Sequence, residues 1–108
     1  MRLQIRSSPF SLTPAVQARV QRRLQFALSR FQAGIGRVTV RLRDLNGPRG
    51  GLDKQCSIEA RLLRRRKCVV EETGSDLYVA IDRAADRLGR LIARHRVAAW
   101  GRLQGEGR

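Results

Sequence analysis

The chain has 108 residues, 42% of them hydrophobic, which is enough for one folded domain with its own core. Its 23 Lys and Arg residues outnumber its 9 Asp and Glu residues and give a formal net charge of +14. This surplus disfavours a cationic substrate and favours a polyanionic partner, above all a nucleic acid. The sequence has no apolar run of roughly 18 residues and no signal-like start, so we expect a cytoplasmic protein outside the membrane.

The N-terminal half of the sequence predicts a strand, a long helix and a second strand. Residues 2–6 alternate apolar and polar side chains, as a half-buried strand does. Thr13-Pro14 supplies an N-cap and a first-turn proline, and apolar residues at three- and four-residue spacing continue the helix to Phe31. Two glycines then end the helix, and alternation resumes over residues 37–43.

The following segment predicts a loop and a β-hairpin. Residues 46–51, Asn-Gly-Pro-Arg-Gly-Gly, cannot continue a strand. Alternating apolar residues then occur over 56–62 and 68–72, with a turn centred near Arg65. We therefore expect two antiparallel strands.

The two cysteines, Cys56 and Cys68, are expected to be small core residues and not a redox pair. A tight turn near Arg65 would place Cys68 opposite Leu62 and away from Cys56. With no CxxC spacing, the cysteines form no metal-site pattern either.

The last part of the chain predicts a second long helix. Residues 73–76 break the strand and cap this helix, whose apolar stripe runs from Leu77 to Ile92. Residues 97–108 carry three glycines and little periodicity, so we expect a domain over 1–96 followed by a short flexible tail.

The order β-α-β-β-β-α predicts an α+β fold with one four-stranded sheet. A long helix between the first two strands requires them to be parallel, whereas short connections make the later pairs antiparallel. Each strand has only one apolar face, so both helices must pack on the same face of the sheet and leave the other face open to water.

Arginines form a stripe on each expected helix. Four on the second helix span an arc of about 60°, and four on the first span about 100° with Phe26 in the middle. The Phe26 ring could stack on a base or close the edge of the core, and both readings stay open. Acidic residues do not interleave the stripes, so we expect both to bind RNA phosphates. The predicted RNA-binding residues are Arg83, Arg87, Arg90, Arg94, Arg19, Arg22, Arg23 and Arg30.

The open face of the sheet is the weaker candidate for RNA binding. It also carries arginines, but Glu59 and Glu71 are placed to pair with some of them. The arginines of this face are Arg2, Arg6, Arg37, Arg41 and Arg61.

The sequence offers little for catalysis. His95, the only histidine, lies near the end of a basic helix, where a dipole partner is more typical than a general base. Asp82 and Asp86 lie one turn apart among arginines, which favours ion pairs such as Asp86 with Arg90 at i, i+4. No phosphate-binding glycine motif or zinc spacing occurs. We therefore expect no enzymatic activity, no metal and no cofactor.

The second helix carries a family resemblance. It resembles the last helix of the hibernation-promoting factor and ribosome-associated inhibitor family, in its short, sigma-54 modulation protein-like form. The matching segments are DLYVAID at 76–82, ADRL at 85–88 and RHR at 94–96. The Thr13-Pro14 helix start and the order of elements agree, so the resemblance covers about residues 1–96.

The resemblance implies a fold outline like that of double-stranded-RNA-binding domains. It also implies binding to the small ribosomal subunit and its rRNA in the decoding channel, which holds ribosomes inactive by occupying the place of mRNA and tRNA. The family's basic positions fall on Arg87, Arg90 and Arg94 of the last helix and on Arg23 of the first. The sequence departs from the family in its 46–51 loop, in its higher charge and in Phe26, where a basic residue is common.

Two alternatives stand beside this hypothesis. One is a general structured-RNA-binding protein or RNA chaperone of the same fold. The other, less favoured, is a small nuclease that uses Asp82, Asp86 and His95. Because long family members carry an additional C-terminal dimerisation domain and this sequence has only a short tail, we also expect a monomer.

Overall fold

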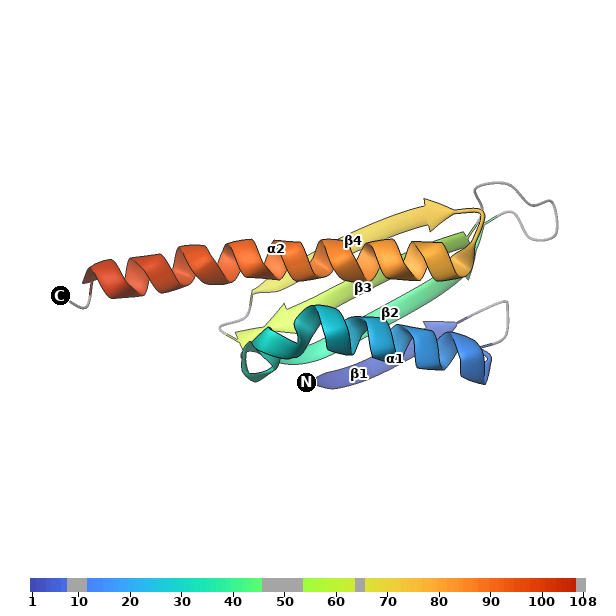
Figure 1. The fold of residues 1–108 in the computed structure, drawn as a ribbon, viewed down its shortest axis with the longest axis horizontal. Helices are drawn as coiled ribbons and strands as arrows, with labels where there is room; N and C mark the ends of the chain where they lie inside the picture. Colours follow the sequence, from blue (N-terminus) through green and yellow to red (C-terminus); the bar gives the residue numbers. More distant parts are fainter. Residues whose placement is uncertain (8–11, 46–53, 64–65, 107–108) are drawn as a thin grey trace.

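The computed structural model describes residues 1–7, 12–45, 54–63 and 66–106, and for residues 96–106 it describes the backbone alone. The elements follow the order that the sequence predicts, with a 3-10 helix added after the first helix (Figure 1). Their bounds are β1 Arg2–Ser7, α1 Pro14–Leu28, η1 Ser29–Gly34, β2 Ile35–Asp44, β3 Lys54–Leu62, β4 Lys67–Gly74 and α2 Leu77–Glu106.

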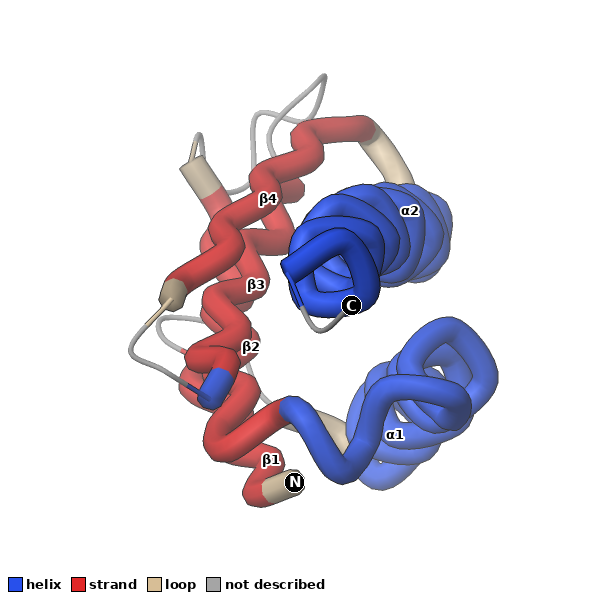
Figure 2. The backbone as a smooth tube through the Cα atoms, turned by 90° about the vertical axis from the view of Figure 1, so that its left-hand side faces the viewer, coloured by secondary structure: helices blue, strands red, loops and turns tan. Residues whose placement is uncertain are grey.

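The four strands form one mixed sheet in the order β1-β2-β3-β4. The β1 and β2 strands are parallel, because α1 carries the chain back between them, and the two later pairs are antiparallel. Both helices lie on one side of the sheet, and its other side is uncovered in the described part of the chain (Figure 2). The predicted α+β class and its two-layer architecture are confirmed.

Local side chains start both helices where the sequence predicts. The Thr13 hydroxyl accepts a hydrogen bond from the backbone N–H of Val16 at 3.2 Å, and Pro14 follows it at the first helical position. The Asp76 carboxylate accepts from the backbone N–H of Tyr78 at 2.9 Å. These bonds satisfy donors that have no partner within the first helical turn.

The core lies between the two helices and the covered face of the sheet. It takes Val20 and Leu24 from α1, Val38 from β2, and Ile81 and Leu88 from α2, all of them essentially inaccessible to water. The alternation of the strands and the three- and four-residue spacing of the helices place these residues in one layer.

Both cysteines are free thiols in this core, as the sequence predicts. Burial raises the pKa of the Cys56 thiol to about 12, so the thiol stays protonated at neutral pH. The predicted hairpin register was wrong, because Cys68 lies opposite Ala60 and not opposite Leu62. The shift of the partner by two residues leaves every side chain on its expected face.

The α2 helix is longer than its apolar stripe. The sequence predicts that the domain ends near residue 96, whereas the α2 backbone continues as a helix to Glu106. These last turns project beyond the end of the sheet (Figure 1). The domain boundary near residue 96 stays a prediction.

The predicted 46–51 loop and the predicted turn residue Arg65 lie outside the described residues. No helix in the described part of the chain is long and apolar enough to cross a membrane.

A glycine allows the two helices to approach each other closely. A Cβ added at Gly89 would lie 3.0 Å from the carbonyl oxygen of Ala27 and 3.4 Å from its Cβ. A glycine inside a helix is less favourable than alanine by about 1 kcal/mol. Close packing of α1 against α2 therefore explains why the position holds glycine.

We predict that Gly89→Val destabilises the fold by about 1–3 kcal/mol, because the branched side chain must push the α1 backbone away. Chemical denaturation measures the free energy of unfolding. The matched control is Arg90→Val, the next residue on the same helix with an exposed side chain, which we expect to change stability by about 0.5 kcal/mol or less. Equal losses in the two variants would contradict the view that the contact with Ala27 sets the cost, because helix propensity alone favours Val over Gly and disfavours Val relative to Arg.

Candidate nucleic-acid interface

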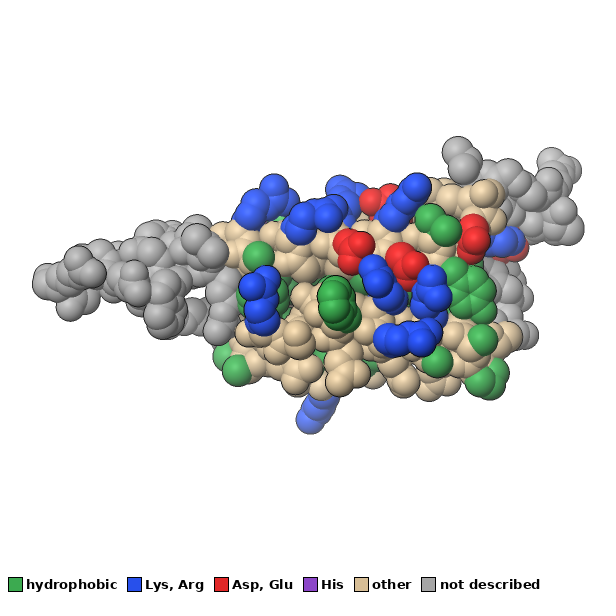
Figure 3. Space-filling model, viewed as in Figure 1, with side chains coloured by type: hydrophobic (Ala, Val, Ile, Leu, Met, Phe, Trp, Pro, Cys, Tyr) green, Lys and Arg blue, Asp and Glu red, His purple; other side chains and the backbone are tan. Residues whose placement is uncertain are grey.

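All eight predicted RNA-binding arginines lie on α1, η1 and α2, and the surface of these helices that carries them is hereafter called the helix face. Figure 3 shows basic side chains along both helices, with acidic side chains between them over part of the boundary. We call this boundary, where Arg19 and Arg23 of α1 meet Asp82 and Asp86 of α2, the seam. Acidic residues thus interleave the two stripes, contrary to the sequence-based expectation. The helix face therefore divides into arginines that have a carboxylate partner and arginines that have none among the described residues.

Arg19 is bound to an aspartate on the other helix. Its Nε donates to Oδ1 of Asp82 at 2.9 Å and its terminal Nη2 donates to Oδ2 at 2.8 Å, so both carboxylate oxygens are engaged. The guanidinium also lies 5.5 Å from the centre of the Tyr78 ring, a contact that the sequence did not predict. Such a two-point ion pair holds the side chain in one orientation.

Arg23 lies one turn further along and bridges two aspartates. Its Nη2 donates to Asp86 at 3.0 Å, while its Nε lies 3.4 Å from Oδ1 of Asp82. That Nε is buried and has no hydrogen-bond partner among the described residues. Both aspartates form ion pairs, as the sequence predicts. The prediction that Asp86 pairs with Arg90 on its own helix was wrong. The actual partners lie on α1, and both hydrogen-bonded pairs have the same sequence separation of 63.

Arg87 is also engaged, with the end of the last strand. Its Nη1 donates to the backbone carbonyl of Glu71 at 3.1 Å and to the Glu72 carboxylate at 3.4 Å. It remains exposed, with its side chain 54% accessible. Arg87 therefore helps to fasten α2 to the edge of the sheet.

The other arginines of the helix face form no salt bridge with any carboxylate in the described part of the chain. All of them are exposed, and they extend over both helices. One of them lies over an aromatic ring, with its guanidinium 5.3 Å from the centre of the Phe31 ring. This unpaired set consists of Arg22, Arg30, Arg83, Arg90 and Arg94.

Phe26 lies among these arginines and outside the core. Its side chain is 75% exposed, which excludes the reading that it closes the edge of the core. The Arg23 guanidinium lies 6.0 Å from the centre of its ring. The ring therefore offers a flat apolar surface next to cations, an arrangement suited to stacking on a nucleobase.

The residues considered for catalysis either form ion pairs with arginines or, in the case of His95, lie in no group of possible metal ligands among the described residues. Asp82 and Asp86 are held by Arg19 and Arg23, and His95 is half-buried on α2. Within the described residues, no group of three His, Cys, Asp or Glu side chains is placed to hold a metal ion.

The electrostatics of the seam follow from these contacts. The hydrogen bonds from Arg19 hold the pKa of Asp82 below its usual value of 3.8, and the positive charges of Arg19 and Arg23 act in the same direction. The same carboxylate raises the pKa of Arg19. Both groups are thus charged at neutral pH.

Comparisons with known proteins agree on one family and one fold. The profile of the family described as Sigma 54 modulation protein / S30EA ribosomal protein matches residues 3–98. The crystal structure of the Thermus thermophilus Protein Y N-terminal domain is similar at 30% identity and a TM-score of 0.73, over 88% of this chain and 99% of that one. A ribosomal subunit interface protein from Coxiella burnetii shares the fold at 15% identity and a TM-score of 0.74, over 90% of this chain and 99% of that one. A search of curated protein sequences gives no significant match.

We predict that Asp82→Asn lowers the free energy of unfolding at pH 7 by about 0.5–1 kcal/mol, because a solvent-screened ion pair is lost. The folded-state pKa of Asp82 is lowered, so its contribution is present above the ordinary value of 3.8 and is lost as the pH falls through the lower folded value. Denaturation of both proteins between pH 7 and pH 2 measures the difference, which should close in acid.

The control for this prediction is Glu71→Gln, which removes an exposed carboxylate that takes part in no salt bridge of the described residues. We expect it to follow the wild-type curve. A gap between Asp82→Asn and the wild type that persisted at pH 2 would show that the ion pair is not its cause.

Proposed function

This chain belongs to the Sigma 54 modulation protein / S30EA ribosomal protein family, and from that membership and the charge of its helix face we propose that it binds the small ribosomal subunit. In this proposal the helix face contacts rRNA in the channel that mRNA and the tRNA anticodon arms use. The bound domain keeps the ribosome inactive in the cytoplasm by occupying that channel. It performs no chemical reaction.

The observation that carries this proposal is the set of five helix-face arginines without a carboxylate partner in the described residues. A guanidinium donates in a planar fork that matches two phosphate oxygens, and binding releases the counterions condensed on the RNA. Arginines on both helices allow one rigid surface to contact phosphates of more than one nucleotide. Phe26 supplies a stacking surface among them.

A steric inhibitor needs a surface that keeps its shape on binding, and the seam supports this requirement. Arg19 and Arg23 are already oriented by Asp82 and Asp86, so they lose little further freedom when the domain binds. The unpaired arginines project from the helices that this seam holds together. The domain is thus suited to dock as one body.

We predict that Arg83→Glu, Arg90→Glu and Arg94→Glu together abolish binding to purified small subunits and relieve inhibition of translation in a cell-free system. The triple change removes three phosphate contacts and adds three repulsions. Arg87 is left intact because it bonds to the end of β4. Cosedimentation with subunits at about 150 mM salt measures binding, where distant charges are screened beyond about 8 Å.

The matched control is Arg6→Glu, Arg41→Glu and Arg43→Glu on the open face of the sheet. These residues are exposed, and the change in net charge is the same. We expect this control to keep most of the binding. Equal losses would show that net charge, and not the helix face, drives binding. If excess tRNA displaced the unchanged protein completely from small subunits, the alternative of a general structured-RNA-binding protein would be favoured instead.

We also predict that salt dependence separates the paired arginines from the unpaired ones. The logarithm of the association constant falls with the logarithm of the salt concentration, so the slope is negative. Arg90→Gln should make this slope less steep by about 0.7–0.9, because one phosphate contact and its counterion release are lost. The double variant Arg19→Gln, Asp82→Asn keeps the net charge and should leave the slope unchanged, since the counterion of Arg19 is a protein carboxylate. Equal drops would mean that Arg19 leaves Asp82 to bind RNA.

A further inference from the structure

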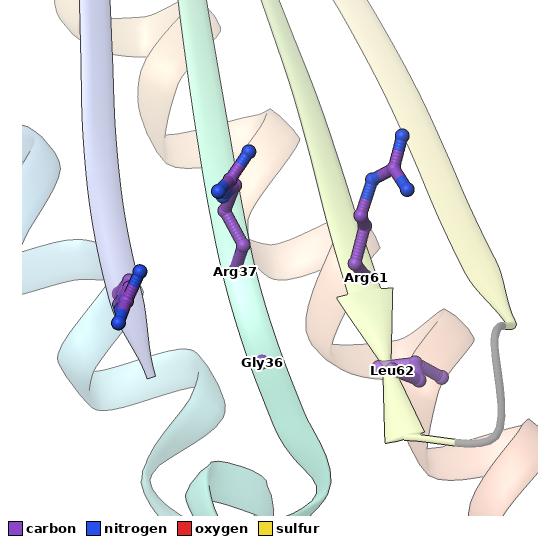
Figure 4. Close-up of a pocket in the computed structure, with 5 residues that line it drawn as sticks. Gly36, Arg37, Arg61 and Leu62 are labelled. Carbon is purple, nitrogen blue, oxygen red and sulfur yellow. The ribbon is translucent and has the colours of Figure 1, made fainter.

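The open face of the sheet carries three arginines in one row across the strands. Arg2 of β1 lies opposite Arg37 of β2, and Arg37 lies opposite Arg61 of β3. Partners in register point to the same face, and all three side chains are exposed. Together with Gly36 and Leu62 they line a hollow at the surface (Figure 4). We call these three arginines the basic row.

The basic row has no neutralising carboxylate among the described residues. Glu59 and Glu71 were expected to pair with arginines of this face, but the Glu59 carboxylate forms a salt bridge with Lys67 at 3.5 Å. Within the described residues, no carboxylate lies within salt-bridge distance of any member of the row. Like charges directly opposite each other on neighbouring strands destabilise a sheet. The row therefore costs stability that the folded chain by itself does not recover.

The backbone at this point is shaped by a bulge. The register of β2 against β3 shifts between Ile35 and Arg37, so Gly36 is an extra residue on the exposed side. A Cβ at Gly36 would meet only the Arg61 carbonyl oxygen, at an ordinary 3.5 Å, and the φ of Gly36 does not require glycine. Neither a close contact among the described residues nor a positive φ thus requires a glycine here. Glycine in a strand is typical of a bulge and of places where a ligand or another backbone approaches closely, so Gly36 fits the bulge and leaves the backbone open to a ligand.

These observations point to an anionic ligand longer than one phosphate group. Three adjacent strands are separated by two spacings of about 4.8 Å, so the row extends over about 10 Å. The hollow lies at the surface and is bordered by guanidinium groups, which suits a chain of phosphates better than an apolar ligand.

We propose that the basic row binds the phosphate backbone of a second RNA segment, on the side of the domain opposite the helix face. This inference extends the proposed function, because it makes the domain a clamp between two RNA segments. The two contact surfaces are separated by the whole thickness of the sheet and helix layers (Figure 2). One short RNA strand would therefore occupy one surface and leave the other free.

The test uses a labelled single-stranded RNA of about eight nucleotides, a length that one binding surface can hold. The starting protein is the full chain with Arg83→Glu, Arg90→Glu and Arg94→Glu, in which the helix face is disabled. We expect it to retain weak RNA binding. Adding Arg2→Gln, Arg37→Gln and Arg61→Gln should reduce this residual affinity about tenfold or more, because three phosphate contacts are lost.

The matched control adds Arg6→Gln, Arg41→Gln and Arg43→Gln to the same starting protein. These arginines lie on the same face, outside the hollow, and the charge change is identical. We expect a loss of about threefold or less. Equal losses for the two triples, or no residual binding to begin with, would overturn the proposal. Displacement of the RNA by an equimolar amount of inorganic phosphate would overturn the assignment to RNA.

Stability without RNA gives an independent readout. The Gln triple of the basic row in an otherwise unchanged chain removes like-charge repulsion, so its thermal midpoint should equal or exceed that of the wild type. A clear drop would show that the row has a structural role and would contradict the proposal.

Cosedimentation of this variant with small subunits separates the clamp hypothesis from the proposed function. Wild-type binding to subunits would leave the proposed function intact and overturn the clamp alone.

Discussion

Asp82 joins the two helices at the point where their charged surfaces meet. It accepts two hydrogen bonds from Arg19 and lies beside Arg23, and both arginines belong to the other helix. The close approach at Gly89 allows the helices to come near enough for these bonds to form. The ion pairs fix the orientation of Arg19 and Arg23, while the core between the helices and the sheet holds α1 and α2 in place.

The seam also changes the meaning of the large positive charge. A count of residues treats all arginines alike, whereas the structure divides them by their partners. Arg19, Arg23 and Arg87 stabilise contacts between elements, and the remaining helix-face arginines have no carboxylate partner among the described residues. The surplus is thus neither a uniform solvated coat nor a single binding stripe. Its structural part and its exposed part lie side by side on the same helices.

The sequence predicted the order of elements, the helix starts and the core because these depend on local patterns. Alternation, helical spacing and the caps at Thr13 and Asp76 act within a few residues, and the burial of both cysteines followed from the same alternation. The hairpin partner of Cys68 was displaced, since the position of a turn depends on the geometry of the whole connection. The faces were still correct because the shift was an even number of residues.

The pairing across the helices could not be predicted in the same way. The i, i+4 rule gave Asp86 a partner on its own helix, but the two helices lie in contact and offer Arg23 instead. The paired residues are 63 positions apart in the sequence. The pairing therefore depends on the position of one helix relative to the other along their common axis. A single sequence contains no direct measure of that position. For the same reason, the helical arc placed the arginines on the two helices but could not predict which of them pair with a carboxylate.

The common direction of α1 and α2 has a consequence for the electric field around the molecule. The pairs that join the helices have equal sequence separations, and the capping residues Thr13 and Asp76 have the same separation of 63 as those pairs. The two helices therefore start level with each other, and both N-terminal ends lie at the same end of the domain (Figure 1). Each helix terminus carries about half an elementary charge. Two aligned macrodipoles thus give the domain a polarity along its length, which would orient it toward a polyanion before any side chain makes contact.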